Sequence, residues 1–244
     1  MRSFSATETI MKLQNSVVLV TGANRGLGLE FAKQALARGA RRVYAAARDV
    51  SSIKLEGVVP VQLDVTKRED AAALARRLPD VTLLINNAGI ARPGAFVAAN
   101  AQAVLREQLE TNVFGILNLS QAFAPILARN GGGAILNVLS VLSWVNTPMI
   151  GGYGVSKSAA WGLTNGLRNE LRAQGTQVVG LHAGFIDTDL TRGFDIPKAK
   201  PADVIRLALD AIEANAEEVF VDQASRQVHQ GLSSSVYLND VMAG

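Results

Sequence analysis

The sequence predicts a doubly wound α/β fold: one domain in which a parallel sheet carries helices on both faces. Short, apolar, β-branched runs alternate along the chain with segments of helical periodicity, which is the order expected for parallel strands joined by crossover helices. The 244 residues suit one large domain, and a composition of 48% hydrophobic and 18% charged residues is typical of a packed protein. No repeat, linker or low-complexity segment divides the chain.

The first strand is predicted at residues 16–21, which are apolar on both faces as expected for the centre of a parallel sheet. A glycine-rich turn follows, and then a helix that ends near Gly39. Pro60 lies in the third strand and has no amide proton, so this strand is predicted at an edge of the sheet. The remaining elements follow in chain order: strands at 43–47, 58–63, 81–86, 134–139, 177–182 and 219–221, and helices at 67–78, 99–129 (one or two), 153–172 and 202–214.

Composition excludes several functional classes. The chain has no cysteine, which excludes disulfides and thiolate catalysis, and with only two histidines no metal site is expected. The net charge of +3 is scattered, whereas a nucleic-acid surface needs a concentrated basic face. No apolar run reaches the roughly 20 residues that cross a bilayer. Residues 1–12 lack the apolar core of a signal peptide, so we expect a flexible extension there, one domain at 13–244, and a cytoplasmic protein.

The glycine-rich turn is the first candidate binding element. Gly22, Gly26 and Gly28 are spaced G-x-x-x-G-x-G between the first strand and the first helix, with Asn24, Arg25 and Leu27 between them. Backbone amides and a helix dipole at such a turn can bind a pyrophosphate. An ordinary strand-to-helix turn would also use glycine, but the position after the first strand favours a dinucleotide site.

The end of the second strand indicates which dinucleotide binds. An acidic residue about 20 residues after the glycine turn usually holds the adenosine ribose, but here the strand ends Ala47-Arg48-Asp49. Arg48, together with Arg25 in the glycine turn, suits the 2′-phosphate of NADP(H) because a guanidinium grips phosphate with paired hydrogen bonds. The alternative is that both arginines are surface residues and Asp49 binds the ribose of NAD(H). We favour NADP(H).

Tyr153 and Lys157 form the candidate catalytic pair. Their spacing of four residues places both side chains on one face of a helix. Ser140 ends a preceding apolar strand, so its hydroxyl can meet them. A free tyrosine, whose pKa is near ~10, is a weak acid–base group, and a lysine ammonium one turn away is expected to lower that pKa. Taken singly, the three residues could be a core tyrosine, a solvated lysine and a strand-end cap.

The motifs occur together in a fixed order: the glycine turn, Asn86-Asn87-Ala88-Gly89, Ser140, and Tyr153-x-x-x-Lys157. The chain thereby resembles the short-chain dehydrogenase/reductase family, in its short branch, over residues 16–222. The resemblance implies a Rossmann-type domain with a seven-stranded parallel sheet in the order 3-2-1-4-5-6-7. It also implies hydride transfer between NADP(H) and a carbonyl or alcohol, and a homotetramer or homodimer packed through two long helices.

The resemblance assigns roles to further residues. Ser140 would orient the carbonyl oxygen, Tyr153 would donate the proton, Lys157 would also bind the nicotinamide ribose, and Asn112 would support a water-mediated proton relay. His182 is expected to be a strand-end residue rather than a catalyst. Further contacts to the cofactor would come from three segments: Asp64 and Val65; Asn87, Ala88 and Gly89; and Gly184, Ile186 and Thr188, where Ala183 replaces the usual proline.

The substrate is expected to be an uncharged, hydrophobic ketone or aldehyde, because the candidate pocket residues are apolar. These are Leu142, Trp144, Val145, Met149, Ile150 and Phe185, with Phe96 as a further candidate. Residues 189–200 are a candidate lid. Arg92 and Arg192 leave open an acidic or carrier-bound substrate, such as a carrier-bound 3-oxoacyl group. A sugar-nucleotide epimerase is disfavoured because a large C-terminal domain is missing. A non-catalytic NADP-binding regulator remains as an alternative, although it would have little need of the Tyr153–Lys157 pair.

Overall fold

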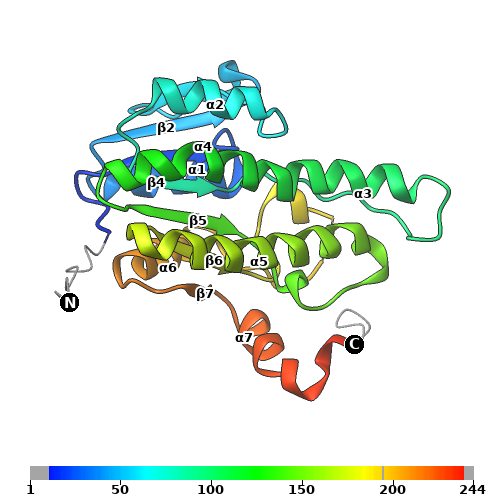
Figure 1. Ribbon diagram of the computed structural model, residues 1–244. Helices are drawn as coiled ribbons and strands as arrows, with labels where there is room; N and C mark the ends of the chain where they lie inside the picture. Colours follow the sequence, from blue (N-terminus) through cyan, green and yellow to red (C-terminus); the bar gives the residue numbers. More distant parts are fainter. Residues whose placement is uncertain (1–10, 194, 239–244) are drawn as a thin grey trace.

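The computed structural model describes residues 11–193 and 195–238, which form a seven-stranded parallel sheet in the order β3-β2-β1-β4-β5-β6-β7 (Figure 1). This confirms the predicted fold class and strand order. The strands are β1 Val17–Thr21, β2 Arg42–Ala47, β3 Val59–Gln62, β4 Leu83–Asn86, β5 Ala134–Val138, β6 Gln177–His182 and β7 Glu218–Phe220. The chain order reverses between β1 and β4, so a crevice opens at the carboxyl ends of these two strands.

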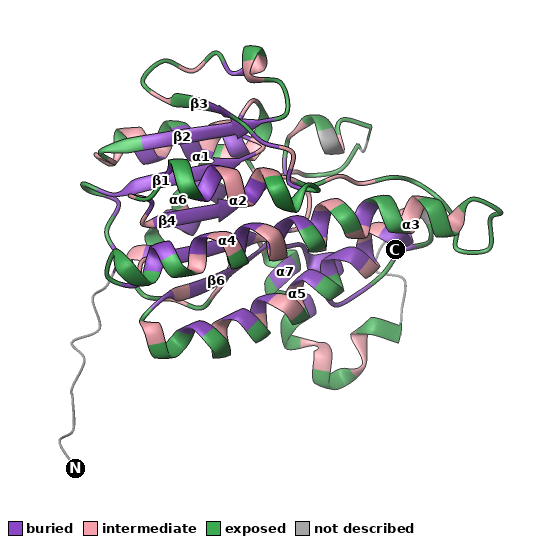
Figure 2. Cartoon of the chain, turned by 45° about the horizontal axis from the view of Figure 1, so that its top comes forward, coloured by how far each residue is buried: buried purple, intermediate pink, exposed green. Residues whose placement is uncertain are grey.

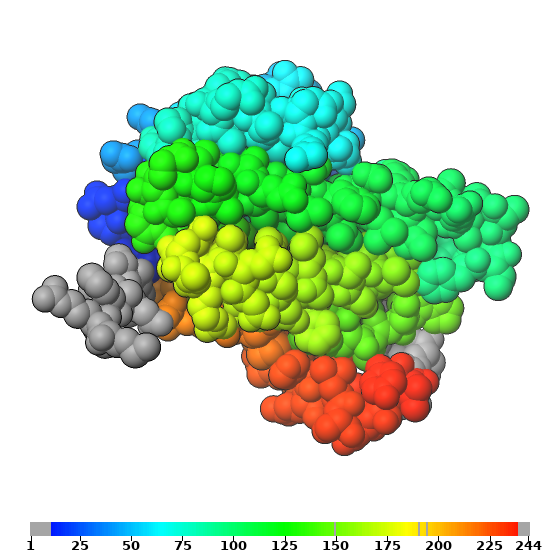
Figure 3. Space-filling view, in the orientation of Figure 1, coloured from blue at the N-terminus to red at the C-terminus, as the bar shows by residue number. Residues whose placement is uncertain are grey.

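Helices cover both faces of the sheet, as Figures 1 and 2 show. α1 and α6 pack in one hydrophobic cluster, and α2, α4 and α5 in a second cluster on the opposite face. On the outer surface α4 and α5 run side by side (Figure 3). The helices are α1 Gly26–Ala37, α2 Arg68–Arg77, α3 Ala101–Leu109, α4 Gly115–Arg129, α5 Gly151–Leu171, α6 Pro201–Glu213 and α7 Gln223–Gln230.

β1 shows why the sequence is apolar on both faces at the centre of the sheet. Val18 and Val20 pack in the cluster beneath α1, and Val17 and Leu19 pack in the cluster beneath α4, all four being fully buried. Burying such a side chain contributes about 1.5–3 kcal/mol relative to leaving it exposed. Pro60 lies in β3, which pairs only with β2 and is an edge strand of the sheet. This position was predicted because proline has no amide proton.

The segment 99–129 is one continuous helical run, formed by α3, a π-helical turn η2 (Glu110–Phe114), and α4. By length and composition alone the run Ala101–Arg129 could cross a membrane, although the sequence suggested no such segment. Its apolar residues Ile116, Leu119 and Phe123 are buried against the sheet. The run is therefore the core helix of an α/β fold. π-helical turns are uncommon and often occur at functional sites.

Two boundaries differ from those predicted. Met11 is buried and Lys12 Nζ donates to the carbonyl of Glu213 at 3.3 Å, so these two residues pack on α6 instead of belonging to the extension. The other ten residues of that extension lie outside the described part of the chain. Beyond β7, α7 forms where no helix was predicted from the sequence. Asp222 caps this helix by accepting the amide of Ser225 at 2.7 Å, and Val228 is buried beneath it.

Candidate functional site

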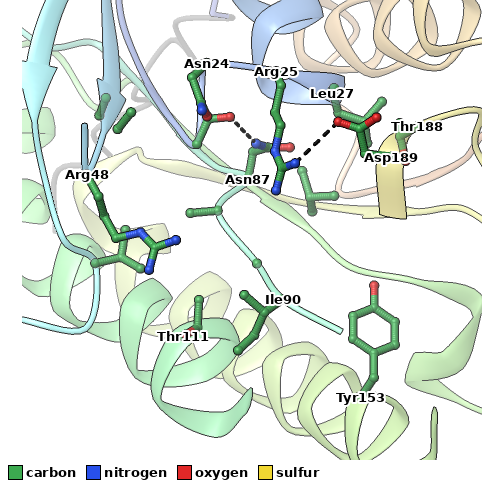
Figure 4. Close-up of a pocket in the computed structure, with 18 of the residues that line it drawn as sticks. Asn24, Arg25, Leu27, Arg48, Asn87, Ile90, Thr111, Tyr153, Thr188 and Asp189 are labelled. Atoms are coloured by element: carbon green, nitrogen blue, oxygen red, sulfur yellow. Dashed lines mark hydrogen bonds and ion pairs between the residues drawn. The ribbon is translucent and has the colours of Figure 1, made fainter. Parts of the chain in front are cut away.

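A cavity of about 690 Å³ opens at the carboxyl ends of the central strands (Figure 4). The glycine turn and the ends of β2 and β3 line one part of it. Ser140, Tyr153 and Lys157 line another, together with the segment that follows β6. Crevices at this edge of a doubly wound sheet are where ligands bind. All the predicted catalytic and cofactor-binding residues lie along this cavity except Gly28 and Asn112, which are placed just behind its wall.

The glycine turn is shaped by its own backbone. Gly22 and Gly26 have φ values of +64° and +54°, which disfavour any residue with a Cβ. At Gly28 a Cβ would lie 2.2 Å from the carbonyl oxygen of Gly22 and 2.6 Å from Asn87 Nδ2. Asn87 Nδ2 in turn donates to the carbonyl of Thr21 at 2.8 Å and more weakly to that of Gly22 at 3.3 Å. Asn87 therefore holds the glycine turn with its side chain, in addition to the backbone role the resemblance implied.

The N-terminus of α1 suits an anion. Arg25 is the N-cap residue but makes no side-chain capping hydrogen bond, and the first turn contains no acidic residue. The first amides of the helix are therefore available to a ligand, and the helix dipole favours a negative charge there. With the closely packed glycines, this arrangement fits a cofactor pyrophosphate.

The two arginines predicted to share a 2′-phosphate lie apart. Arg25 pairs with Asp189 across the cavity, with Nη1 3.4 Å from Oδ2, whereas Arg48 projects into the cavity from the end of β2 (Figure 4). The expected site in which both arginines bind one 2′-phosphate is therefore not present, because Arg25 is paired with Asp189 on the opposite side of the cavity from Arg48. Asp49, the alternative ribose ligand, accepts the amide and hydroxyl of Ser51 at 2.9 and 2.7 Å. Its carboxylate is committed to a local turn, and Arg48 remains as the charged group facing the adenosine end.

Asp64 and Val65 follow β3 at the same end of the cavity. Burial acts to raise the pKa of Asp64, but hydrogen bonds from Thr66 and the charges of Lys67 and Arg48 lower it, so the net pKa is below its usual value. Asp64 is therefore an ionised carboxylate near neutral pH. Val65 packs against Gly115, where a Cβ would approach its side chain to 2.9 Å. This contact brings the segment after β3 close to the start of α4.

Ser140 and Tyr153 meet at the other end of the cavity. Ser140 caps a short 3₁₀ helix, η3 Val141–Ser143, and its Oγ accepts the amide of Leu142 at 3.1 Å. Tyr153 lies in the first turn of α5, which begins two residues earlier than predicted. Burial raises the pKa of Tyr153 to about 12, and the hydrogen bond with the Ser140 side chain only partly opposes that rise. At neutral pH the phenol is protonated, which is the form that a general acid requires.

Lys157 lies one turn further along α5 and is almost fully buried. Its Nζ donates to the carbonyl of Val138 at 2.6 Å and is 5.6 Å from the centre of the Tyr153 ring. Burial lowers the pKa of Lys157 to about 8. The expected lowering of the Tyr153 pKa is therefore not observed, because desolvation of the phenol raises its pKa more than the hydrogen bond with Ser140 lowers it.

Asn112 lies in the π-helical turn η2, and its side chain is fully engaged. Oδ1 accepts the amide of Ile90 at 2.8 Å, while Nδ2 donates to the carbonyl of Ile90 at 2.8 Å and to Ser156 Oγ at 2.9 Å. The side chain thereby ties the segment after β4 to α5, next to Lys157. Its role is that of a brace in this structure, and no hydrogen bond joins it to Lys157 among the described contacts.

The segment after β6 is held from two sides. The amide of Val141 donates to the carbonyl of Ala183 at 2.8 Å, and the amide of Gly184 donates to Asp222 Oδ2 at 2.6 Å. Asp222, which the sequence did not single out as a site residue, thus fixes a turn that lacks the usual proline. Beyond it, Ile186 forms a bridge with Ala199, and Thr188 lines the cavity.

The predicted substrate-pocket residues do not line this cavity among the described residues. Leu142, Trp144 and Val145 are buried in a third cluster with Val228 of α7, and Ile150 and Tyr153 pack against this cluster. Phe96 is 54% exposed at the end of a loop. The side chain of Met149 lies outside the described ones. Phe185 likewise does not line the cavity. The hydrophobic pocket that these residues were expected to form is therefore not observed among the described side chains.

Other residues that line the cavity are Ile90, Arg92, Glu107 and Thr111. Arg92 pairs with Glu107, with Nη2 3.0 Å from Oε1, and its amide donates to Gln108 Oε1 at 2.9 Å. Of this set the sequence suggested only Arg92, as a candidate for an acidic substrate. Its position just after Asn86-Asn87-Ala88-Gly89 was the available signal, since residues at the carboxyl end of β4 reach the cavity.

Comparison with known proteins agrees with this geometry. The family described as "short chain dehydrogenase" matches residues 16–198. A solved structure of a short chain dehydrogenase from Burkholderia cenocepacia J2315 in complex with NADP is 39% identical, with a TM-score of 0.88 over 92% of this chain and 95% of that one. A galactitol 2-dehydrogenase (L-tagatose-forming) of Cereibacter sphaeroides is 34% identical, covering 75% of this chain and 76% of its own. A 3-oxoacyl-(acyl-carrier-protein) reductase of Staphylococcus epidermidis is 30% identical, covering 72% and 78%.

Proposed function

The chain belongs to the short-chain dehydrogenase family and is an NAD(P)-dependent oxidoreductase acting on CH–OH groups, and we propose that it uses NADPH to reduce a ketone or aldehyde. One observation carries the proposal: a protonated Tyr153, in contact with Ser140 and one turn from Lys157, lies at one end of a cavity whose other end is the glycine turn. A proton donor and a dinucleotide site in one cavity are the two requirements of carbonyl reduction.

NADPH is supported by the residues at the adenosine end. Gly22, Gly26 and the first amides of α1 would hold the pyrophosphate, and Arg48 would bind the 2′-phosphate, while Asp49 is engaged with Ser51. Gly184, Ile186 and Thr188 would face the nicotinamide. The NADP-bound relative from Burkholderia cenocepacia supports the same choice.

Bound NADPH would supply the hydride for the carbonyl carbon. Ser140 would hold the carbonyl oxygen, and Tyr153 would transfer its phenolic proton to the alkoxide as the negative charge develops. Lys157 would bind the ribose and, in its charged form, stabilise the tyrosinate that remains. Asn112 would keep the segment after β4 and α5 in register, which fixes the distance between cofactor and catalytic side chains. Positioning of this kind is a large part of the rate gain in enzymes.

For the substrate, we propose an uncharged ketone or aldehyde. The apolar residues that favoured a hydrophobic compound do not line the cavity, whereas the ion pair of Arg92 and Glu107, and Thr111, do line it. A polar wall of this kind can hydrogen-bond hydroxyl groups. The relatives that act on galactitol and on carrier-bound 3-oxoacyl groups make a hydroxylated ketone and a 3-oxoacyl thioester the two alternatives worth testing beside simple ketones.

The test is a panel of simple ketones and aldehydes, ketoses and 3-oxoacyl thioesters, each followed by the loss of NADPH absorbance. We expect turnover with at least one class, and no turnover by Tyr153→Phe under the same conditions. NADPH binding without turnover across the panel would favour the alternative of a non-catalytic NADP-binding regulator.

We also propose a cytoplasmic homotetramer or homodimer. The outer face of α4 and α5 carries partly exposed apolar side chains, including Ala124, Trp161 and Leu163. Phe114, at the start of this face, is 45% exposed. Light scattering of the purified protein would measure its mass, and a monomer would contradict the proposal.

A further inference from the structure

His182 lies behind the catalytic serine, at the end of β6, and is fully buried. Its Nδ1 is 3.3 Å from the backbone carbonyl oxygen of Ser140, and its Nε2 is 2.6 Å from Glu218 Oε2 on the neighbouring strand β7. An unbroken chain of contacts therefore runs from a carboxylate, through an imidazole, to the peptide that carries the Ser140 hydroxyl. The sequence indicated only a strand-end residue at this position.

Aromatic rings and a glycine surround the pair of His182 and Glu218. The Trp144 ring stacks on His182 at 4.0 Å with an interplanar angle of 19°, and Phe220 lies 5.7 Å away. Gly180 leaves space for the pair, since a Cβ there would lie 3.0 Å from Glu218 Oε2 and 3.3 Å from His182 Nε2. A buried polar ring is costly unless its nitrogens are hydrogen-bonded. Both nitrogens of His182 have partners.

The partners determine which nitrogen carries a proton. The carbonyl of Ser140 can only accept, so Nδ1 is the donor of that hydrogen bond. Burial acts to raise the pKa of Glu218, but its hydrogen bond and attraction to His182, with the charge of Arg168 3.0 Å away, bring the net pKa below its usual value. An ionised carboxylate offers only acceptor oxygens to Nε2. The other titratable group nearby is His229 of α7, whose ring contacts Trp144 and Phe220.

We propose that His182, held by Glu218, is a positioning residue that fixes the Ser140 peptide and hence the hydroxyl that meets Tyr153. The Ser140 carbonyl also accepts the amide of Ser143 at 3.0 Å, so the imidazole completes a two-donor clamp on one oxygen. The inference rests on the proposed role of Ser140. It adds a carboxylate–imidazole support, reaching across the sheet from β7, to the machinery for the reaction.

The kinetic test compares His182→Leu with His182→Asn. Both variants lose the stacked ring, but asparagine retains a donor near the position of Nδ1. We expect His182→Leu to lower kcat at least tenfold while the Kd of NADPH changes less than twofold, and His182→Asn to recover most of kcat. A purely structural role predicts that both fall alike, or that the polar asparagine is worse. Phe220→Leu, which loosens the ring cluster without touching the hydrogen bonds, should lower the melting temperature and leave kcat unchanged.

A second pair of variants leaves His182 in place. Glu217 and Glu218 both pair with Arg168, but of the two only Glu218 contacts His182. Glu218→Leu should therefore lower kcat at least fivefold, and Glu217→Leu should not. Equal kcat values in the two variants would overturn the proposal, even if His182→Leu failed to fold.

A third measurement does not depend on turnover. The chain has only two histidines, so ¹⁵N-histidine labelling gives two rings to resolve, and His182→Asn identifies the signal of His182. We expect Nδ1 of His182 to carry a proton in the folded protein, and the signal to shift in Glu218→Leu. An Nδ1 without a proton would exclude the hydrogen bond and overturn the proposal. Ser140→Ala separates the two claims: if it retains wild-type kcat, the proposed role of Ser140 fails; if it abolishes turnover while His182→Leu does not, only the support by His182 fails.

Discussion

Arg48 is expected to determine the preference for NADPH. Its guanidinium enters the cavity from the end of β2, close enough to Asp64 to lower the pKa of that carboxyl group. Arg25, by contrast, is paired with Asp189. Replacing Arg48 by alanine therefore removes the cationic side chain that this structure directs to the adenosine end, without disturbing the glycine turn.

The size of the effect follows from the exposure of this side chain. A hydrogen bond to a charged group contributes about 1.5–3 kcal/mol, and screening at an exposed arginine favours the lower half of that range. One bidentate contact of about 1.5–2.2 kcal/mol would then change Kd roughly 10- to 40-fold. We expect Arg48→Ala to weaken NADPH binding within that range and to change NADH binding less than threefold. Arg48→Asp should weaken NADPH binding further.

Titration of nicotinamide fluorescence measures both constants. Arg42→Ala is a matched control, because Arg42 lies at the opposite end of the same strand and pairs with Asp80 at 3.0 Å. It removes the same charge from the protein without facing the cavity. If Arg48→Ala weakened NADPH and NADH binding equally, or changed neither, the assignment of the 2′-phosphate to Arg48 would be refuted.

Three other predictions follow from the same site. Gly28→Ala should cost about 1–3 kcal/mol of unfolding free energy through overpacking and weaken NADPH binding, because its Cβ would collide with Gly22; unchanged binding in a titration would contradict this. The rate of carbonyl reduction should fall as the pH rises through about 8, because Lys157 loses its proton there. The rate of alcohol oxidation should rise with pH, because that reaction needs the tyrosinate of Tyr153. Initial rates of reduction that increase above pH 8 would contradict these roles. Asp222→Ala should lower the free energy of unfolding by about 2.5 kcal/mol, since a helix cap contributes ~1 kcal/mol and a charged hydrogen bond ~1.5 kcal/mol, and it should raise the Kd of NADPH. Urea denaturation and the same titration measure the two effects, and wild-type values would refute the role of Asp222 in holding Gly184.

The sequence predicted those features that are written in local patterns. The doubly apolar run of β1 identified a central strand, Pro60 identified an edge strand, and the fourfold spacing of Tyr153 and Lys157 placed both on one helix face. Each of these depends on residues a few positions apart, where periodicity and backbone chemistry determine the outcome. The fold class was accordingly predicted correctly, and the strand order agrees with the one that the resemblance to the short-chain dehydrogenase/reductase family implied.

Features that depend on distant pairing were missed. Asp222 contacts Gly184, 38 positions away, and Glu218 contacts His182, 36 positions away. No local sequence pattern indicates either contact. Arg25 forms an ion pair with Asp189, which is 164 residues away in the sequence, instead of facing the adenosine end. The apolar residues around Trp144 were assigned to the substrate pocket. Their hydrophobicity indicates that they are buried, but it does not indicate which neighbouring element covers them. That neighbour is α7, a helix the sequence did not predict.

The effect of desolvation on the pKa values of Tyr153 and Lys157 could not be predicted from the sequence either. The proximity of Lys157 suggested a lowered pKa for Tyr153, but that argument assumed a solvated ammonium. In the structure Lys157 is buried and Tyr153 is partly buried, and desolvation raises the pKa of the phenol and lowers that of the amine. The protonated phenol fits the reducing direction.

The most direct test of the account is Tyr153→Phe, which removes a single hydroxyl. With the carbonyl compound that the wild type reduces fastest, NADPH oxidation should fall to the uncatalysed rate, while the fluorescence titration should give a Kd for NADPH within about twofold of the wild type. That combination would establish Tyr153 as the proton donor of an otherwise intact cofactor site. Reductase activity that survived in Tyr153→Phe would contradict the central claim.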